Sequence, residues 1–253
     1  QFELARAPHH LIDVAAPTEI YDADRYGCEG RAVLADLHHR QVPPLVAGGT
    51  GLYLKALLHG LFEEGAPNPT IRARLRRELH DLGLPGLYQR LAELDPVTAG
   101  RLHPHDTYRI LRALEVIEAT GQPLSELLEA HRFRNCPFQV LKLGLTRPRA
   151  ELNERIDRRV EAMLAQGLLS EVEVLLSRYS PDLKPLQSLG YRHLINFLKG
   201  EWSWDEAIEL LKRDTRRYAK RQLTWFRADP EVRWFHPDQI DDLTAALQEF
   251  FGG

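Results

Sequence analysis

The stretch QVPPLVAGGTGLYLKALLHGL, residues 41–61, changes its pattern twice along its length. Residues 45–47 are a short, continuously apolar run, which is typical of a strand buried in a parallel sheet. The small residues 48–50 then turn the chain, and the apolar spacing over residues 52–61 predicts a helix. A strand, a glycine turn and a helix in this order predict a βα unit of a doubly wound α/β sheet.

The bulk composition excludes several classes of protein. The chain has 253 residues, of which 43% are hydrophobic and 27% charged, and this matches a folded globular protein. Because the formal net charge is only -3, a polyanionic partner must meet a local basic patch. Cys28 and Cys136 form neither a CxxC pair nor a zinc-ligand spacing, as expected in a reducing cytosol. No run approaches the length of a membrane span and no signal peptide is visible, so we expect a cytoplasmic protein without membrane contact. We also expect a monomer.

Helical spacing dominates the rest of the chain. It predicts helices over residues 23–40, 71–82, 107–120, 149–179 and 190–227, with Asp106 as an N-cap, Gly121 as a stop and Gly167 as a break. Apolar runs predict strands over residues 138–145 and 232–236, and a strand or its approach over residues 9–14. We therefore expect an α/β core with a helical insertion: the first part of the core over residues 1–62, a mainly helical region over 63–135, and a core return with a further helical part over 136–253.

Residues 212–227 form a strongly basic stretch. They contain seven lysines and arginines against one acid, Asp214, and Tyr218, Trp225 and Phe226 lie among them. A run of charges is usually a solvated helix face, and that interpretation stays open. The scarcity of acids and the interleaved rings favour RNA, since basic residues neutralise phosphates and aromatic rings stack on bases.

Two other patterns suit phosphate or a simple turn equally well. The turn in AGGTGLY, residues 47–53, can bring backbone N–H groups and the Thr50 hydroxyl to a ligand, although it is not a Walker A loop. Arg109 and Arg112 share one turn of a predicted helix and can hold a phosphate. The nearby HPHD, residues 103–106, resembles a metal cluster, but without a further ligand set a turn and cap is the better interpretation.

Two arginine-containing segments also have structural alternatives. Arg155 and Arg159 lie four residues apart on a predicted helix, where salt bridges to Glu154 or Glu161 are the simpler explanation. QSLGYRHL, residues 187–194, joins a loop to a helix. It is either a structural turn or a loop that offers an amide, a ring and a guanidinium to a nucleotide.

Taken in order, these patterns resemble one family. The chain is similar to bacterial tRNA dimethylallyltransferases, the IPP transferase family, from about residue 8 to residue 234, through PHHLIDV, LVAGGTGLYLKALLHGL, RLHPHDTYRILRALEV, ERIDRRVEAMLAQGLLSEV, SLGYRHL and AKRQLTWFR. The resemblance implies a P-loop-kinase-like parallel-sheet core flanked by helices, with a helical insertion. It implies transfer of a dimethylallyl group from dimethylallyl diphosphate to N6 of adenosine 37, beside the anticodon, in tRNAs that read codons beginning with U. It also implies Mg²⁺, which assists the departure of diphosphate.

The resemblance further implies which residues touch the anticodon stem-loop of tRNA. Thr50 is the catalytic candidate within this sequence and also a tRNA contact. The other matched positions are Arg72, Tyr108, Arg109, Ile110, Leu111, Arg112, Gln187, Ser188, Leu189, Gly190, Tyr191, Arg192, Lys220, Arg221, Gln222, Leu223, Thr224, Trp225, Phe226 and Arg227. For the diphosphate we add Arg155 and Arg159, and we assign no metal ligand.

The chain departs from the family pattern at its beginning. Neither the family's GPTxSGKT-type P-loop nor its DSxQxY segment, whose aspartate is the expected general base, occurs in this sequence. The sequence begins at Gln1 and its single methionine is Met163, so we expect a further N-terminal segment to precede it. We expect the chain as given to be inactive without that segment.

Two other functions stay open. An adenylate isopentenyltransferase or a nucleotide kinase-like phosphotransferase would act on free nucleotides and would not need the basic residues 212–227. A non-catalytic RNA-binding fragment would keep the basic stretch without the chemistry.

Overall fold

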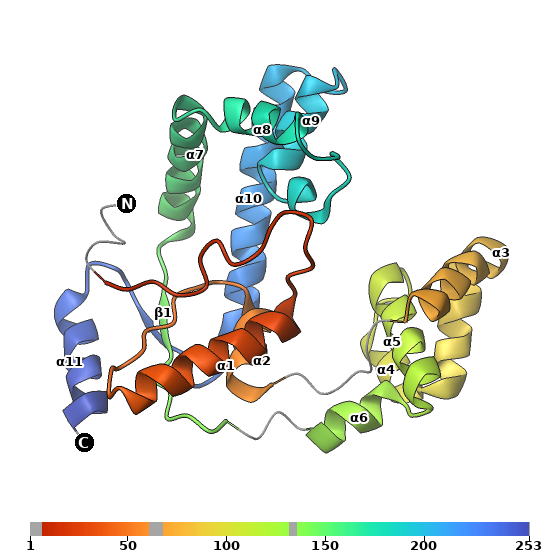
Figure 1. Cartoon of the computed structure of the whole chain (residues 1–253), viewed down its shortest axis with the longest axis horizontal. Helices are drawn as coiled ribbons and strands as arrows, with labels where there is room; N and C mark the ends of the chain where they lie inside the picture. Colours follow the sequence, from red (N-terminus) through yellow and green to blue (C-terminus); the bar gives the residue numbers. More distant parts are fainter. Residues whose placement is uncertain (1–6, 61–67, 132–135, 253) are drawn as a thin grey trace. The chain divides into compact units, whose positions relative to one another are not determined.

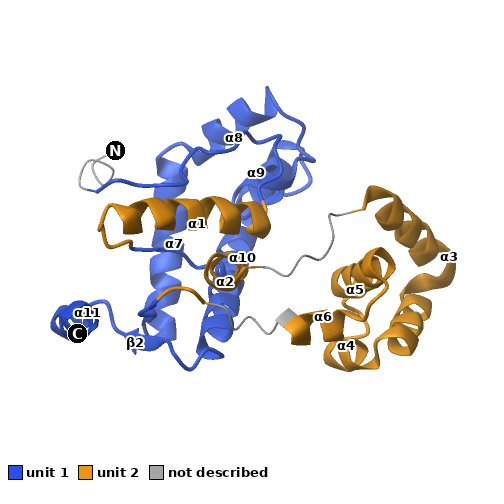
Figure 2. Ribbon diagram, turned by 60° about the horizontal axis from the view of Figure 1, so that its bottom comes forward, with its two compact units in different colours: residues 1–21, 45–51, 139–253 blue, residues 22–44, 52–138 orange. Residues whose placement is uncertain are grey.

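The computed structural model describes residues 7–60, 68–131 and 136–252. The chain divides into two compact units, one of residues 1–21, 45–51 and 139–253, the other of residues 22–44 and 52–138 (Figure 2). The boundaries expected near residues 62 and 135 fall outside the described residues. The expected division into residues 1–62, 63–135 and 136–253 therefore stays a prediction.

A parallel pair of strands anchors the first unit. β1 (Leu143–Leu145) pairs with β2 (Arg233–Phe235), with Gly144 opposite Trp234. The chain between these strands is helical, and parallel strands require such a crossover. The combination of parallel pairing and helical crossover confirms the α/β class.

Helices make up most of the first unit. They are α7 (Arg149–Ala165), α8 (Leu168–Leu176), the short 3₁₀ helix η1 (Lys184–Gln187), α9 (Tyr191–Leu198), α10 (Trp204–Arg227) and α11 (Ile240–Gly252). α10 packs against α7 and α9 (Figure 1). Val172, Leu186, Leu194 and Ile195 form an apolar cluster between α8, η1 and α9. Burial of these side chains holds the loop over residues 187–190 between η1 and α9.

The described residues of the second unit form helices joined by turns and loops. Its elements are α1 (Ala23–His39), α2 (Gly51–His59, with Gly51 in the first unit), α3 (Pro69–Leu94), α4 (Pro96–Arg101), α5 (Thr107–Thr120) and α6 (Leu124–His131). α3 is kinked at Gly83, whose φ of 69° no α-helix accommodates. The apolar faces of α3 and α5 form a core that includes Leu75, Leu87, Leu91, Ile110, Ala113 and Leu114. This packing sets which side chains of α3 and α5 meet at their surface.

Asp95 is a buried carboxylate that joins three helices of this unit. It follows α3, caps α4, and accepts four hydrogen bonds: from Thr98 N (2.9 Å) and Oγ1 (2.6 Å), and from Ser125 N (2.9 Å) and Oγ (2.7 Å) near the start of α6. Burial by itself raises the pKa of Asp95, but these four donors outweigh it and leave the pKa below its ordinary value. The charge is therefore retained in the core, where it aligns α4 with α6.

Several predicted elements are confirmed. α1 begins after Asp22, whose side chain accepts from Arg25 N, and α5 has the predicted Asp106 cap and ends at Gly121. Gly167, with a φ of 98°, separates α7 from α8 as the sequence predicted. α9 and α10 form the predicted helix pair over residues 190–227, and β2 lies within residues 232–236.

Other expectations were wrong at the level of single elements. Residues 9–14 do not form a strand, because Leu11 (φ 60°) and Asp13 (φ 54°) adopt left-handed backbone that interrupts an extended chain. Residues 45–47 are neither a strand nor buried, and Leu45 is 89% exposed. The described strands are β1 and β2 alone, so this apolar run has no ladder to join. The strand expected over residues 138–145 is confined to β1, and α11 was missed.

Candidate functional site

The turn around Thr50 packs directly on α10 within the first unit. Gln222 Nε2 donates to Gly49 O at 2.8 Å. A Cβ atom on Gly51 would overlap the indole of Trp225, and one on Gly49 would overlap the amide of Gln222. The backbone of this loop (residues 49–51, the Thr50 loop) therefore lies against side chains of α10, and the close approach to a rigid ring requires glycine at Gly51. The structure thus brings together two motifs that are far apart in the sequence.

The end of α10 beside the Thr50 loop presents charge and aromatic surface to solvent. Thr50 is exposed, and so are Lys220, Arg221 and Arg227. None of these three cations has an acidic partner within the part of the chain that the structure describes. Trp225 is 50% exposed although its ring also lies on Gly51. This end of α10 (residues 220–227, the α10 C-terminal segment) can therefore meet a polyanion without first breaking an ion pair.

The remaining residues of the α10 C-terminal segment shape this surface. Leu223 and Phe226 are half-buried, and the Thr224 hydroxyl donates to Lys220 O at 3.0 Å. Arg221 lies over the ring of Tyr218, with its guanidinium carbon 5.8 Å from the ring centre. Tyr218 thus orients one of the three exposed cations.

The first part of the basic stretch is engaged within the protein. Arg216 makes a bidentate ion pair with Asp157 of α7, with Nη2 at 2.7 and 2.9 Å from the two carboxylate oxygens. Lys212 Nζ lies 3.0 Å from Oε1 of Glu161, one turn further along α7. These two cations are therefore engaged in ion pairs between α10 and α7 and do not lie on a merely solvated helix face.

Asp214, the one acid of the basic stretch, collects several basic groups. Arg192 Nη2 donates to its Oδ2 at 2.6 Å, and Arg213 Nε donates to its Oδ1 at 3.0 Å. Arg217 Nη1 lies 3.5 Å from Oδ1. Burial alone raises the pKa of Asp214, but hydrogen bonds from Arg213, His193 and Arg192 reverse this, and the pKa lies below its ordinary value. Asp214 is therefore a carboxylate that fixes arginines of α9 and α10.

His193 lies fully buried beneath this cluster. Its Nε2 is 3.4 Å from Asp214 Oδ2, and its ring faces Trp202. Burial, the largest effect, lowers the pKa of His193 despite the neighbouring carboxylate. A neutral, packed histidine here serves the α9–α10 contact.

The segment over residues 187–192, from the end of η1 to the start of α9, is held by contacts of its own. Gln187 Nε2 donates to Pro181 O at 2.7 Å, and Tyr191 Oη donates to Glu171 Oε1 at 2.5 Å. The latter bond, with burial, raises the pKa of Tyr191 to about 12. Ser188 is exposed, Leu189 is half-buried, and Gly190 precedes α9 with a φ of 93°. Side chains predicted to contact tRNA are thus partly occupied in shaping this loop.

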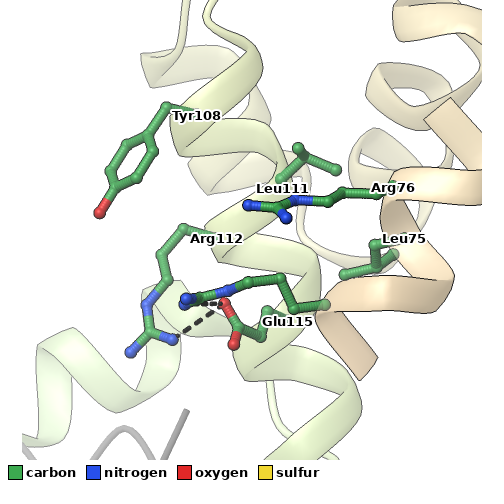
Figure 3. Close-up of a pocket in the computed structure, with 7 residues that line it drawn as sticks. Leu75, Arg76, Tyr108, Leu111, Arg112 and Glu115 are labelled. Carbon is green, nitrogen blue, oxygen red and sulfur yellow. Dashed lines mark hydrogen bonds and ion pairs between the residues drawn. The ribbon is translucent and has the colours of Figure 1, made fainter. Parts of the chain in front are cut away.

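A cavity of about 110 Å³ lies between α3 and α5 in the second unit (Figure 3). Its lining consists of Arg72, Leu75, Arg76, Tyr108, Leu111, Arg112 and Glu115. Four of these residues were predicted to contact tRNA, and they come from two separate motifs. Tyr108 is 80% exposed beside the cavity. Of the other YRILR residues, Arg109 pairs with Asp106 at the helix start, and Ile110 is fully buried in the core.

Known proteins resemble this chain over nearly its whole length. The family model described as IPP transferase matches residues 1–229. A tRNA dimethylallyltransferase of Syntrophobacter fumaroxidans is 51% identical over 246 residues, which are 97% of this chain and 72% of that protein. One of Desulfatibacillum aliphaticivorans is 48% identical over 244 residues, with 96% and 80% covered. The chain belongs to the IPP transferase family.

Solved structures of this family share the fold. The full-length tRNA isopentenylpyrophosphate transferase from Bacillus halodurans superposes with a TM-score of 0.68 at 33% identity, covering 99% of this chain and 82% of that one. The tRNA delta(2)-isopentenylpyrophosphate transferase from Staphylococcus epidermidis gives 0.66 at 30% identity, with 98% and 83% covered. The P-loop-kinase-like α/β class implied by the sequence is therefore confirmed for this IPP transferase.

Two further predicted features of this IPP transferase are the arginine pair on α7 and the turn over residues 103–106. Arg155 and Arg159 are exposed on α7, and the salt bridges expected for them do not form: Glu154 lies near Arg158, and Glu161 near Lys212. Asp106 caps α5, and His103 Nδ1 accepts from His105 N, as a turn and cap require. No cluster of three or more potential metal ligands occurs among the described residues. Within the same residues, no helix is both long and apolar enough to cross a membrane.

Two carboxylates that organise the arginines were missed by sequence reasoning. Glu115 follows YRILR on the same helix, and Asp214 was noted only as a lone acid. The available signal was in each case an acid three residues from an arginine on a helix, Arg112 and Arg217 respectively. Spacing alone does not distinguish such an acid from an exposed surface pair.

Proposed function

We propose that this chain transfers a dimethylallyl group from dimethylallyl diphosphate to N6 of adenosine 37 in tRNAs that read codons beginning with U. Family membership supports the reaction type. The observation that carries the proposal is the packing of the Thr50 loop on the α10 C-terminal segment, through Gln222 and Trp225. This packing brings the Thr50 loop next to the Trp225 ring and the exposed cations of the α10 C-terminal segment.

The reaction requires a bond to form between adenine N6 and the allylic carbon while the carbon–oxygen bond to diphosphate breaks. A proton leaves N6 for a base. The exocyclic amine is a weak nucleophile, because its lone pair is delocalised into the ring, so alignment with the allylic carbon is decisive. We assign Thr50 to hydrogen bonding with the adenine, since the pKa of an alcohol is too high for an efficient base.

The adenine must leave the anticodon stack to reach such a site. Flipping a base requires a few kcal/mol, which stacking and backbone contacts must return. Trp225 offers a stacking surface, and Lys220, Arg221 and Arg227 offer charge for the phosphates of the anticodon stem-loop. The segment over residues 187–192 and the cavity between α3 and α5 offer further contacts to the RNA.

The departing diphosphate needs charge neutralisation. Arg155 and Arg159, exposed on α7 and without an acidic partner among the described residues, are available for this task. Mg²⁺ would neutralise diphosphate when bound. The described residues offer no carboxylate cluster for an ion, so we assign it no protein ligand.

The test is a transfer assay with labelled dimethylallyl diphosphate and an unmodified tRNA that carries adenosines at positions 36 and 37. With the full-length protein we expect label in the tRNA, and loss of that label when position 37 is guanosine. AMP is offered as a competing acceptor. Labelled AMP would instead indicate an adenylate isopentenyltransferase, and tRNA binding without transfer would indicate a binding protein.

A further inference from the structure

Asp214 of α10 is the shared partner of three arginines. Its Oδ2 accepts from Arg192 Nη2 of α9 at 2.6 Å, and its Oδ1 accepts from Arg213 Nε at 3.0 Å and lies 3.5 Å from Arg217 Nη1. The Asp214 side chain is 16% exposed, whereas those of the three arginines are 41%, 48% and 62% exposed. One largely buried acid thus holds three cations at the surface. These four residues are the Asp214 cluster.

The charges of the Asp214 cluster do not balance. None of its arginines pairs with another acid among the described residues, so three positive charges meet one negative charge. His193, whose Nε2 lies 3.4 Å from Asp214 Oδ2, adds no charge near neutral pH, because burial lowers its pKa. Each arginine contacts Asp214 through one nitrogen, and a guanidinium carries five N–H donors. The surplus charge and the remaining donors suit a phosphate group.

Arg216, the neighbour of Arg217 on α10, provides an internal contrast. Its Nη2 lies 2.7 and 2.9 Å from the two carboxylate oxygens of Asp157, so one cation meets one acid in a bidentate pair. Arg217 instead shares its acid with two other arginines, and its side chain is more exposed than that of Arg216. Two adjacent arginines therefore differ in what they can still bind.

The Asp214 cluster continues the exposed basic surface of the α10 C-terminal segment. Arg213, Arg217 and Arg221 follow one another at intervals of four residues, so they lie along one side of α10. Lys220, which is also exposed, lies three residues beyond Arg217. The row from Arg213 to Arg221 spans roughly 12 Å of helix. A row of cations of this kind can follow the backbone of a nucleic-acid strand.

We infer that the Asp214 cluster is a binding site for phosphates of the RNA backbone. Its three arginines contact the phosphates, and Asp214 is the positioning residue that orders their side chains. This inference rests on the proposed function, in which the chain binds tRNA. Without the carboxylate, the guanidiniums repel one another and regain rotamer freedom, which must be lost again when RNA binds.

The first test compares the adjacent arginines of α10 in the full-length protein, by equilibrium binding to an unmodified tRNA at several salt concentrations. We expect Arg217→Ala to raise the dissociation constant about fivefold and to lower the slope of log K against log salt by roughly 0.7 to 0.9. Arg216→Ala is the matched control, and we expect it to change the dissociation constant less than about twofold. Equal effects of the two variants would overturn the inference.

The second test concerns Asp214, and its sign separates positioning from simple proximity. If Asp214 were only a nearby negative charge, Asp214→Asn would tighten RNA binding. We expect it instead to raise the dissociation constant about threefold, because the arginines lose their order. Asp157→Asn is the control, since it releases Arg216 from a balanced pair and should not weaken binding. Equal or tighter tRNA binding by Asp214→Asn would overturn the inference.

Folding and the source of the phosphate are checked separately. Urea unfolding establishes that each variant is folded at the temperature of the binding assay. Arg213→Ala changes an exposed side chain and keeps the inference testable if Asp214→Asn does not fold. We expect it to act as Arg217→Ala does, and unchanged tRNA affinity would overturn the inference.

Dimethylallyl diphosphate is the other source of phosphate in the proposed reaction. We expect Arg217→Ala to leave the KM for dimethylallyl diphosphate within about twofold, because the cluster contacts the RNA. A raised KM with unchanged tRNA affinity would assign the cluster to diphosphate and overturn the inference. Failure of the proposed function is a distinct outcome, since the parent protein would then fail to bind tRNA or to transfer the label.

Discussion

Two parts of α10 are basic, with four lysines and arginines in residues 212–217 and three in residues 220–227, but they meet different surroundings. In residues 212–217, Lys212 and Arg216 reach Glu161 and Asp157 of α7, while Arg213 and Arg217 turn to Asp214. In the α10 C-terminal segment, Lys220, Arg221 and Arg227 lie exposed without an acid among the described residues, beside the Thr50 loop. The number of basic residues therefore does not decide whether they pair within the protein or remain available for RNA. Where a neighbouring helix supplies acids, the basic side chains form ion pairs within the protein. Where the neighbour is the Thr50 loop, the basic side chains can bind a polyanion.

The largest expected effect tests the contact between the Thr50 loop and α10. In Gly51→Ala the new methyl group would overlap the indole of Trp225, so the loop or the ring must move. We expect prenyl transfer to fall about 100-fold, because displacements of this order disrupt alignment of reacting atoms. Gly48→Ala is the matched control, since a Cβ atom there meets nothing within 4 Å. A transfer rate that fell equally in both variants would show that the loop is generally intolerant.

The next effect tests whether the unpaired cations bind RNA. We expect Lys220→Ala and Arg221→Ala each to weaken tRNA binding about 5-fold and to lower the slope of log K against log salt by roughly 0.7 to 0.9. Lys212→Ala removes a cation that is already paired with Glu161, so it should leave that slope unchanged. Identical slopes for all three variants would remove the distinction between the two halves.

A smaller effect concerns the pH dependence of stability, through the ion pairs of Asp214. The pKa of Asp214 is lowered in the folded protein, so its contribution to stability is complete above the ordinary aspartate pKa and is lost as the pH falls through the folded-state value. We expect Asp214→Asn to lower the free energy of unfolding by about 1 kcal/mol near pH 7. The stabilities of the variant and the unmodified protein should converge as the pH falls below the lowered pKa of Asp214. A constant difference across that range would assign the loss to packing instead.

The smallest effect concerns the ion pair of Arg216. Both partners are about one-third exposed, so we expect Arg216→Ala to lower the free energy of unfolding by only about 0.5 to 1 kcal/mol. The affinity for tRNA should stay within about twofold, because this guanidinium is already bound by Asp157. Chemical denaturation and a binding titration check the two parts. A loss of affinity as large as that of Lys220→Ala would place Arg216 on the RNA surface.

Local patterns were predictable where a residue acts within its own helix. The cap at Asp106, the end at Gly121 and the break at Gly167 follow from local backbone chemistry and are confirmed. The prediction of strands over residues 9–14 and 45–47 was wrong. Strand formation depends on pairing with another strand, and the residues of a segment do not specify that partner. The partners of Arg155 and Arg159 were wrong for the same reason: Glu161 contacts Lys212 of another helix.

By itself, the sequence determined the main helices up to residue 227, the family motifs and the identity of the basic and aromatic residues around α10. Only the tertiary structure decided which arginines are engaged, that Gly49 and Gly51 lie against Gln222 and Trp225, and that Glu115 joins Arg72 to Arg112. The physical reason is one of range. Helix periodicity and capping act over three or four residues, whereas the state of a charged side chain depends on whatever group the fold places within a few ångströms of it.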